Sequence, residues 1–466
     1  MLTDTAPIFS PELLSRLDIN GPRYTSYPTA DRFHEGFDAA AYGRSLAARA
    51  DASRHRSATP LSLYIHIPFC ESVCYYCACN KVITRHHDRA AEYLQALDIE
   101  IGLNRDALGG RQPVSQLHFG GGSPTFLSDA ELAGLMASLR DAFDILRDAE
   151  VSIEVDPRTV DGGRLASLRH LGFNRISFGV QDFDPAVQKA VHREQSEAMV
   201  RKLVEHARAL GFVSINTDLI FGLPLQTPTS FARTVEQIGV LRPDRIALYA
   251  YAHLPSRFKP QRRILSADLP LAGARVQMLQ GALEGFLGQG YRYIGMDHFA
   301  LPDDALAIAQ RQGKLHRNFQ GYTTQPDSDL IGLGVSAIGG VGASYAQNAK
   351  TLPEYYEALR AGRFAVVRGI ALDAEDLLRR DVIMAVMCQG RVDFAAVEAN
   401  HAVSFSRHFA PELASLARYA DMGLVRIGPT SIEVTPTGWF FVRVLAMAFD
   451  SALAAAASRE RFSRVI

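Results

Sequence analysis

Apolar and polar residues alternate along six short stretches of the chain. In the first, Leu61, Leu63, Ile65 and Ile67 are separated by Ser62, Tyr64 and His66. A period of two predicts a β-strand, because successive side chains of a strand point to opposite faces. The same alternation returns five times, at residues 117–119, 151–155, 176–181, 215–221 and 246–249.

Between these strands lie stretches that predict helices, including residues 88–108, 129–143 and 196–210. Alternation of strands and helices indicates an α/β fold with a parallel sheet. A parallel sheet covered on both faces should be almost uniformly apolar, yet here one face of each strand is polar. A closed eight-stranded barrel would fill its interior with bulky branched side chains. We therefore predict an open partial barrel of six units, (β/α)6, lined for binding.

The chain divides into four regions by pattern. Residues 1–60 are predicted to form an irregular N-terminal arm. Its segment 23–28 ends at Pro28, which favours an extended backbone over a helix. Residues 61–300 form the partial barrel, and residues 301–370 an extension that closes one edge of the site. Residues 371–466 predict a mainly helical domain that resembles a winged helix, with helices at 375–387, 394–399 and 411–422, a hairpin at 423–435 and a last helix from Thr437.

Charge and hydropathy limit the partners. The chain has 466 residues, with 49 Lys and Arg against 50 Asp and Glu, so no global charge points to nucleic acid or to a membrane surface. In the C-terminal domain the arginines are scattered, which favours a lid or scaffold over DNA binding. Residues 1–7 lack the features of a signal peptide, and no run of about 18 apolar residues occurs. We expect a cytoplasmic monomer.

Three cysteines, Cys70, Cys74 and Cys77, follow the first strand with the spacing C-x3-C-x2-C, and Cys79 is close by. In a reducing compartment, clustered cysteines are typical metal ligands. Three thiolates from one loop favour an iron–sulfur cluster with one iron open to an outside ligand. A zinc site closed by Cys79 and a redox thiol pair remain alternatives. The fifth cysteine, Cys388, lies on an apolar helical stretch and is interpreted as a buried small hydrophobe.

The second strand ends in a run of glycines, residues 120–122, followed by Ser123 and Pro124. The run lacks both the third glycine of a dinucleotide fingerprint and the lysine of a P-loop. Three glycines allow a ligand to approach the backbone closely, although a plain tight turn would also account for them.

The cysteine spacing after a strand resembles that of radical S-adenosylmethionine (SAM) enzymes. Four further features resemble one family of these enzymes, the oxygen-independent coproporphyrinogen III oxidases. They are residues 21–28, the Cys-x-Cys that ends at Cys79, residues 118–125 and residues 318–324. The resemblance implies a six-unit partial barrel and a 4Fe-4S cluster held by Cys70, Cys74 and Cys77. The open iron of that cluster binds the methionine part of SAM.

The resemblance also implies the cofactor contacts, each at a position that matches the family's motifs. Tyr64, Gly121, Glu154 and Ile338 match the contacts of one SAM. Tyr76, Gly122, Ser123, Gln181, Arg193, Asp218 and Ala252 match the contacts of a second SAM, and Ala78 is a further cofactor contact. Tyr76 departs from the family, which often has phenylalanine there. The arm of the family reaches the active site, so Arg23 and Tyr24 are expected to contact substrate.

The chemistry implied by the resemblance is oxidative decarboxylation. A 5′-deoxyadenosyl radical takes hydrogen from two propionate side chains of coproporphyrinogen III, which become the vinyl groups of protoporphyrinogen IX. A low-potential electron donor is required, and no catalytic acid or base. Cations should meet the four substrate carboxylates, and the candidates are Arg23, Arg263, Lys314 and Arg317. Alternatives are a heme-binding chaperone or a heme-modifying radical SAM relative, but Cys79 and the N-terminal arm favour the oxidase.

Overall fold

The computed structural model describes residues 19–55, 59–325 and 328–455, together with Leu13, Arg16, Leu17 and Phe462. The stretch of residues 1–7, for which the sequence predicts no signal peptide, lies outside the described residues, as does most of the chain after residue 455. Among the helices that the structure describes, none combines the length and the apolar character needed to cross a bilayer.

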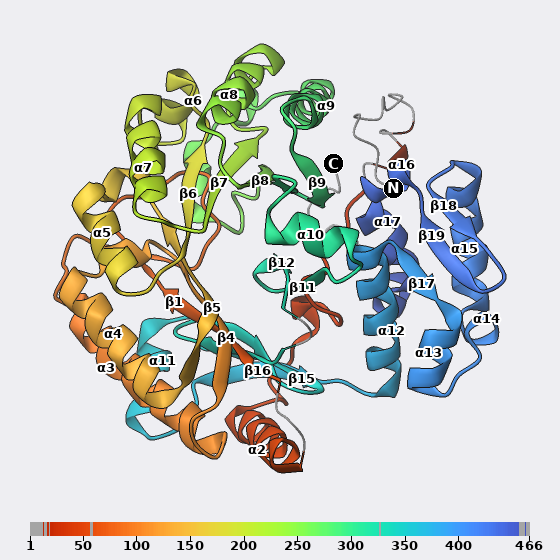
Figure 1. Ribbon diagram of the computed structural model, residues 1–466, viewed down its shortest axis with the longest axis horizontal. Helices are drawn as coiled ribbons and strands as arrows, with labels where there is room; N and C mark the ends of the chain where they lie inside the picture. Colours follow the sequence, from red (N-terminus) through yellow and green to blue (C-terminus); the bar gives the residue numbers. More distant parts are fainter. Residues whose placement is uncertain are drawn as a thin grey trace.

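A twelve-stranded sheet forms the centre of the molecule (Figure 1). Six adjacent strands run parallel and follow one another in chain order, as the alternating pattern predicts. They are β1 (Leu61–Ile67), β4 (Pro113–Gly121), β5 (Asp144–Val155), β6 (Arg175–Gln181), β7 (Ser214–Phe221) and β8 (Arg245–Ala250). The predicted α/β partial barrel is therefore confirmed.

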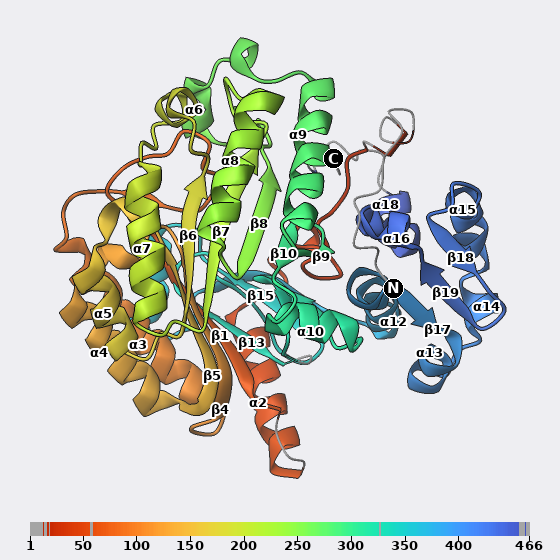
Figure 2. The same cartoon turned by 45° about the horizontal axis from the view of Figure 1, so that its top comes forward.

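Helices cover one face of this sheet, on the outside of the curve (Figures 1 and 2). They are α3 (Arg89–Ala107), α4 (Asp129–Ala142), α5 (Gly162–His170), α6 (Pro185–Ala190), α7 (Glu197–Ala209), α8 (Pro228–Leu241) and α9 (Ala272–Gly288). In β6 the apolar residues Ile176, Phe178 and Val180 are buried in the core, whereas Ser177 and Gly179 between them line a cavity. The polar inner face expected from the sequence is therefore present.

Further strands extend the sheet at both edges. Beyond β1 lie β13 (Leu330–Leu333), β14 (Ile338–Gly340), β15 (Ser344–Asn348) and β16 (Val366–Ala371), of which only β13 is parallel to its inner neighbour. Beyond β8 lie β10 (His298–Ala300) and β9 (Arg292–Gly295), both antiparallel. In the described part of the chain β16 and β9 do not pair, so the sheet stays open.

Two short sheets stand apart from the large one. Strands β2 (Phe69–Cys70) and β3 (Val82–Ile83) hold the two ends of the cysteine loop together. Strands β11 (His316–Asn318) and β12 (Gly321–Thr323) form a hairpin between the barrel and the C-terminal helices (Figure 1). Helices α10 (Ala305–Arg311) and α11 (Leu352–Arg360) complete this part of the chain.

The N-terminal arm is less irregular than expected. It contains a short 3-10 helix η1 (Ala30–Arg32) and a 17-residue helix, α2 (Ala39–His55), whose Tyr42 and Leu46 are buried. The prediction of an irregular segment up to residue 60 was wrong here. Pro28 predicts an extended backbone only for the residues next to it. Residues 39–55 are rich in alanine, which is the strongest helix former.

The C-terminal region contains the predicted helices as α12 (Ala374–Met384) with a π-helical turn (Ala385–Gln389), α13 (Phe394–His401) and α15 (Ala410–Asp421), with α14 (Phe405–His408) between the last two. The predicted hairpin is β18 (Val425–Ile427) and β19 (Ser431–Val434), joined by β17 (Arg391–Asp393).

The last helix expected from Thr437 is broken into α16 (Pro436–Trp439), α17 (Val442–Ala446), a 3-10 turn (Met447–Phe449) and α18 (Ser451–Ala455). Two polar side chains of this segment bind the N-terminal arm. Arg443 Nε donates to the carbonyl of Pro22 at 2.7 Å, and Asp450 accepts from the Tyr24 hydroxyl at 2.8 Å. The interruptions therefore occur where the segment packs against another part of the chain, which a local pattern does not reveal.

Candidate active site

The polar face of the partial barrel encloses a cavity of about 590 Å³. Its walls come from β4 to β8, from the cysteine loop after β1 and from hairpin β11–β12. Many residues singled out in the sequence meet in this wall. They are Cys70, Cys74, Tyr76, Cys77, Gly121, Gly122, Ser123, Glu154, Gln181, Arg193 and Asp218.

The cysteine loop is fixed by backbone hydrogen bonds. Cys70 lies in β2, and its carbonyl accepts from the amide of Thr84 at 2.9 Å. A turn places the Cys77 amide on the carbonyl of Cys74 at 3.2 Å, and the Tyr75 amide donates to Val191 at 3.0 Å. Cys74 is buried, and Cys70 and Cys77 are half-buried. The loop thus holds three thiols at one end of the cavity.

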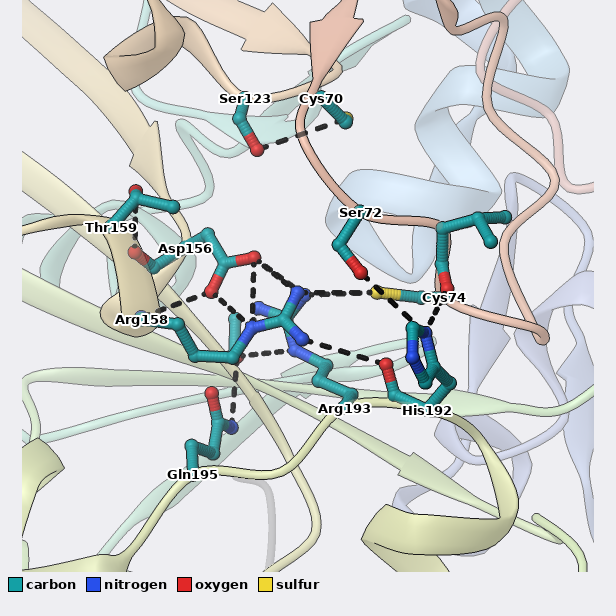
Figure 3. A network of polar contacts seen from close by, with 12 residues as sticks. Cys70, Ser72, Cys74, Ser123, Asp156, Arg158, Thr159, His192, Arg193 and Gln195 are labelled. Atoms are coloured by element: carbon teal, nitrogen blue, oxygen red, sulfur yellow. Dashed lines mark hydrogen bonds and ion pairs between the residues drawn. The ribbon is translucent and has the colours of Figure 1, made fainter. Parts of the chain in front are cut away.

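Hydrogen-bond donors surround two of the sulfurs (Figure 3). Ser123 Oγ lies 3.7 Å from Cys70 Sγ. Arg193 Nη1 and Arg158 Nη2 lie 3.3 and 3.6 Å from Cys74 Sγ. Such donors favour thiolates, the form that binds metal. The thiol of Cys79 and the ammonium of Lys81 act likewise on Cys77 and lower its pKa to about 6, whereas burial raises the pKa of Cys70 to about 11.

The sulfurs are not arranged around a single ion. Within residues 19–55, 59–325 and 328–455, no three His, Cys, Asp or Glu side chains come close enough to share one metal. A closed zinc site needs four donors that converge on one ion. The ligands of an iron–sulfur cluster bind different irons and do not need to converge in this way. Three thiols on one loop with donors beside them therefore fit a cluster better than zinc.

The glycine run packs directly on the cysteine loop. A side chain at Gly122 would lie 2.7 Å from the backbone of Pro68 and Phe69, and one at Gly121, where φ is +109°, would lie 2.6 Å from the ring of His66. The Gly122 amide donates to Ile67 at 2.7 Å and the Ser123 amide to Phe69 at 2.8 Å. These glycines are therefore required for close approach, and the nearest partner is the chain that leads into the cysteines.

Glu154 points into the cavity from β5 beside the glycine run. Its carboxylate accepts from the Gly121 amide at 3.3 Å and lies 3.2 Å from His118 Nε2, while His118 Nδ1 lies 2.6 Å from Ser152 Oγ. Burial alone would raise the pKa of Glu154, but the contacts with His118 and the Gly121 amide hold it below its usual value. Glu154 is therefore an ionised acceptor that faces the cavity.

Tyr64, on β1, belongs to the same corner, although it does not line the cavity. Its ring stacks on that of His118 with the centroids 5.9 Å apart, and its hydroxyl lies 3.2 Å from His66 Nδ1. Gly332 of β13 connects Tyr64 with Ile338. It pairs with Tyr64 across β1 and β13, and a side chain at Gly332 would lie 2.6 Å from the Ile338 carbonyl oxygen. The four residues implied as contacts of one SAM thus come from β14, β1, β4 and β5, which are four of five consecutive strands of the sheet.

Arg193 is central to a second group of polar contacts (Figure 3). Its Nη1 lies 3.2 Å from Asp156 Oδ2, and its Nη2 and Nε donate to the carbonyl of Gly179 at 2.7 and 3.2 Å. Arg158 binds the same carboxylate at 2.7 Å. Burial would raise the pKa of Asp156, but the two arginines lower it. Asp156 and Arg158 were not identified from the sequence, because they follow β5 without a recognisable motif.

Asp218, on β7, faces the cavity between two polar neighbours. It accepts from Ser177 Oγ at 3.0 Å and from Asn216 Nδ2 at 2.8 Å. Burial and the negative charge of Glu154 raise the pKa of Asp218 to about 6. Its carboxylate has no cationic partner in hydrogen-bond contact among the described residues, so it can accept hydrogen bonds from a ligand.

Tyr76 and Ala252 are joined by a residue that sequence reasoning missed. Gln261, which is buried, donates from Nε2 to the carbonyl of Tyr76 at 3.0 Å and to that of Ala252 at 3.2 Å. Gln261 lies in a 3-10 turn after β8, where no periodicity marks it. Ala78 is exposed on the cysteine loop and does not line the cavity.

The expected substrate contacts are distributed differently. Tyr24 is fully buried with its hydroxyl on Asp450, away from the cavity wall. Arg23 forms an ion pair with Asp297 and lies over the ring of Tyr249, which lines the cavity. Arg263 contacts Tyr75 at the surface and Lys314 is exposed, whereas Arg317 is buried in β11.

Residues 64–238 of the chain match the Radical SAM superfamily, and residues 372–441 match the HemN C-terminal domain. The chain is 50% identical over 460 residues to an oxygen-independent coproporphyrinogen III oxidase of Pseudomonas aeruginosa. The aligned residues cover 98% of each chain. It is 48% identical to the protein of that name from Escherichia coli K12, over 97% of this chain and 98% of the relative.

Among solved structures, the fold matches coproporphyrinogen III oxidase (HemN) from Escherichia coli, described as a radical SAM enzyme. The TM-score is 0.88 and the sequence identity 47%, and the match covers 94% of this chain and 100% of the other. The likeness therefore extends over the barrel, its edge strands and the C-terminal region together.

Proposed function

Because the chain belongs to the oxygen-independent coproporphyrinogen III oxidase family of radical SAM enzymes, we propose that it converts two propionate side chains of coproporphyrinogen III to vinyl groups, giving protoporphyrinogen IX. One structural observation carries the proposal. Three cysteines of a single loop, flanked by Ser123, Arg158 and Arg193, face the same cavity as the polar side of the barrel.

Cys70, Cys74 and Cys77 would hold a 4Fe-4S cluster with one iron open to SAM. When bound, the reduced cluster and SAM supply a radical that takes a hydrogen atom from the β-carbon of a propionate. That propionate would then become a vinyl group by losing carbon dioxide and passing one electron to an external electron acceptor. No step needs a catalytic acid or base, so the residues of the cavity act by binding, orienting and shielding.

We further propose two SAM sites. Tyr64, Gly121, Glu154 and Ile338 would form the first, in which the ionised Glu154 accepts hydrogen bonds from an amine or hydroxyl. Tyr76, Gly122, Ser123, Gln181, Arg193, Asp218 and Ala252 would form the second, with Ala78 nearby. The support is that the contacts around Glu154 join β4 and β5, whereas those around Asp218 and Arg193 involve β6, β7 and the loop after α6.

The remaining regions have proposed roles around this site. Residues 1–60 would act as an arm beside the active site, residues 61–300 as the catalytic barrel and residues 301–370 as an extension that closes it. Residues 371–466 would act as a lid or scaffold, supported by the hydrogen bond from Trp439 Nε1 to the Ile294 carbonyl at 3.1 Å. We propose that the enzyme is a cytoplasmic monomer that takes electrons from a low-potential donor.

The test is anaerobic turnover. Protein refilled with iron and sulfide is incubated with coproporphyrinogen III, dithionite and SAM, and the products are oxidised and separated. Protoporphyrin that forms only when SAM is present supports the proposal. Heme that binds stoichiometrically, with no conversion of coproporphyrinogen III, would overturn it in favour of a heme-binding chaperone. Conversion of heme under the same conditions would indicate a heme-modifying enzyme instead.

A further inference from the structure

Around hairpin β11–β12 lie several buried nitrogen atoms that have no hydrogen-bond partner among the described residues. They are Arg245 Nη2, His298 Nδ1, Arg317 Nε, Arg317 Nη1 and Gln320 Nε2. Arg245, His298 and Gln320 line the cavity. Arg317 is next to this wall rather than part of it: its guanidinium lies over the ring of Tyr322, 4.7 Å from the centroid, and Tyr322 lines the cavity. We call these four residues, Arg245, His298, Arg317 and Gln320, the arginine end of the cavity.

This end carries an unbalanced positive charge. Arg23 pairs with Asp297, and Arg245 Nε lies 2.9 Å from both oxygens of Asp304. Arg317 is 92% buried and forms no ion pair with any residue in the described ranges. Its hydrogen bond is a long one, from Nη2 to the carbonyl of Arg23 at 3.5 Å. A buried guanidinium usually has an anionic partner, so its absence here points to a ligand that is not part of the chain.

The electrostatics of His298 agree with this placement. Burial and the positive charges of Arg317, Arg23 and Arg245 lower its pKa to about 3. The imidazole is therefore neutral, and three guanidinium groups act on it from the N-terminal arm, from β8 and from β11. An anion placed among them would gain from all three charges and could accept from the nitrogens that lack partners.

The arginine end of the cavity lies far enough from the cysteines to suit a large anion that carries several carboxylates. Arg245 is the first residue of β8, whereas the cysteine loop follows the last residue of β1. The six neighbouring strands from β1 to β8 in the sheet are all parallel, so these residues lie at opposite ends of the polar face. A tetrapyrrole that presents one propionate to the cysteine end would extend others toward the arginine end.

We propose that the arginine end binds a propionate carboxylate of the porphyrinogen that is not the one reacting, and that Arg317 supplies the charge for it. The inference rests on the proposed function, since it takes coproporphyrinogen III as the substrate. Four carboxylates enter the reaction and only two are lost, so a carboxylate is present for Arg317 in both rounds. Arg317 is then a residue that orients substrate rather than one that reacts.

The test compares Arg317→Gln and Arg317→Lys with Arg311→Gln. Arg311 is exposed on α10, and its Nη1 donates to the nearby Pro302 carbonyl at 2.8 Å. Three quantities are measured for the anaerobic holoenzyme: the Kd for coproporphyrin III, by fluorescence titration, and the KM and kcat for coproporphyrinogen III. Loss of charged hydrogen bonds should raise Kd and KM about tenfold or more in Arg317→Gln. Arg317→Lys should recover part of this, and Arg311→Gln should match the parent protein.

A second substrate sharpens the test. This substrate is an analogue in which one non-reacting propionate is replaced by ethyl. If the missing carboxylate is the one that Arg317 binds, Arg317→Gln and the parent protein should bind the analogue equally well, because neither can form the interaction. Circular dichroism, cluster absorbance and SAM cleavage without substrate should be unchanged in Arg317→Gln, which separates loss of binding from misfolding.

The outcomes distinguish the two proposals. If the parent protein binds coproporphyrin III but does not convert the porphyrinogen, the function fails, and the inference still stands or falls on the Kd of Arg317→Gln. Equal Kd values for Arg317→Gln and the parent would overturn the inference. The same holds if Arg317→Gln and Arg317→Lys misfold while every single-ethyl analogue binds the parent as tightly as coproporphyrin III does.

Discussion

Arg193 Nη1 lies 3.3 Å from the sulfur of Cys74 and also 3.2 Å from a carboxylate oxygen of Asp156. The guanidinium thus joins the cysteine loop to the end of β5, and its other nitrogens bind the Gly179 carbonyl of β6. One side chain fixes three segments around the cavity. A negatively charged thiolate at Cys74 would be stabilised by the same group.

This geometry predicts the effect of Arg193→Lys. An ammonium cannot make the forked contact with Gly179 and still reach both Asp156 and Cys74. Asp156 keeps Arg158, so we expect the free energy of unfolding to fall by about 1–3 kcal/mol, together with a lower rate of SAM cleavage. Urea unfolding of anaerobic protein and a cleavage assay measure the two effects. Arg201→Lys, on the exposed face of α7, is the control and should change neither.

The relationship also shows what the sequence can and cannot predict. The alternation identified the six parallel strands β1, β4, β5, β6, β7 and β8, because burial of one face requires it, but it did not reveal β13, which also pairs with β1 in parallel. Cys70, Cys74 and Cys77 were found because a loop brings its own residues together. Asp156 and Gln261 follow no local pattern, since their roles arise from contacts with distant segments. Arg317 was one of four candidate cations, and only its burial in the folded chain distinguishes it from the exposed Lys314. The broken C-terminal helix was missed for the same reason.

Gly122→Ala should damage the site with little effect on the rest of the fold. The added carbon would lie 2.7 Å from backbone atoms of Pro68 and Phe69, which cannot move without shifting the cysteine loop. We expect reduced iron content after reconstitution and weaker SAM binding, measured by iron analysis and by titration.

Gly134→Ala is the matched control, because the space beside this exposed glycine of α4 is empty. It should raise the free energy of unfolding by about 0.5–1 kcal/mol and leave iron content unchanged. Equal iron content in both variants would contradict the role given to Gly122.

The variants Cys70→Ser and Cys388→Ser should distinguish a cysteine that binds the cluster from one that only packs in the core. Cys70 lines the cavity beside Ser123, so its replacement should abolish both cluster assembly and activity. Cys388 is buried in the π-helical turn after α12 and does not line the cavity, so its replacement should leave both nearly intact. Visible absorbance after anaerobic reconstitution and the turnover assay measure these effects. Similar losses in the two variants would show that the ligands are assigned wrongly.

Glu100 should make stability depend on pH. This α3 carboxylate is buried and accepts from the Tyr355 hydroxyl at 2.6 Å, the Gly334 amide at 2.7 Å and Asn348 Nδ2 at 2.6 Å. Burial outweighs these donors and raises the pKa of Glu100 from 4.5 to about 7. The folded protein therefore holds this proton more tightly than the unfolded chain does.

The sign follows from that difference in proton binding. Between pH values of about 4.5 and 7 the native state binds more protons, so the contribution of Glu100 to stability is full at the lower pH and is lost as the pH rises through 7. Glu100→Gln cannot ionise. The free energy of unfolding of the parent, minus that of Glu100→Gln, should fall by about 2 kcal/mol from about pH 5.5 to about pH 8. Urea midpoints at several pH values measure this difference, and a difference that stays constant or rises with pH would show that Glu100 is ionised throughout.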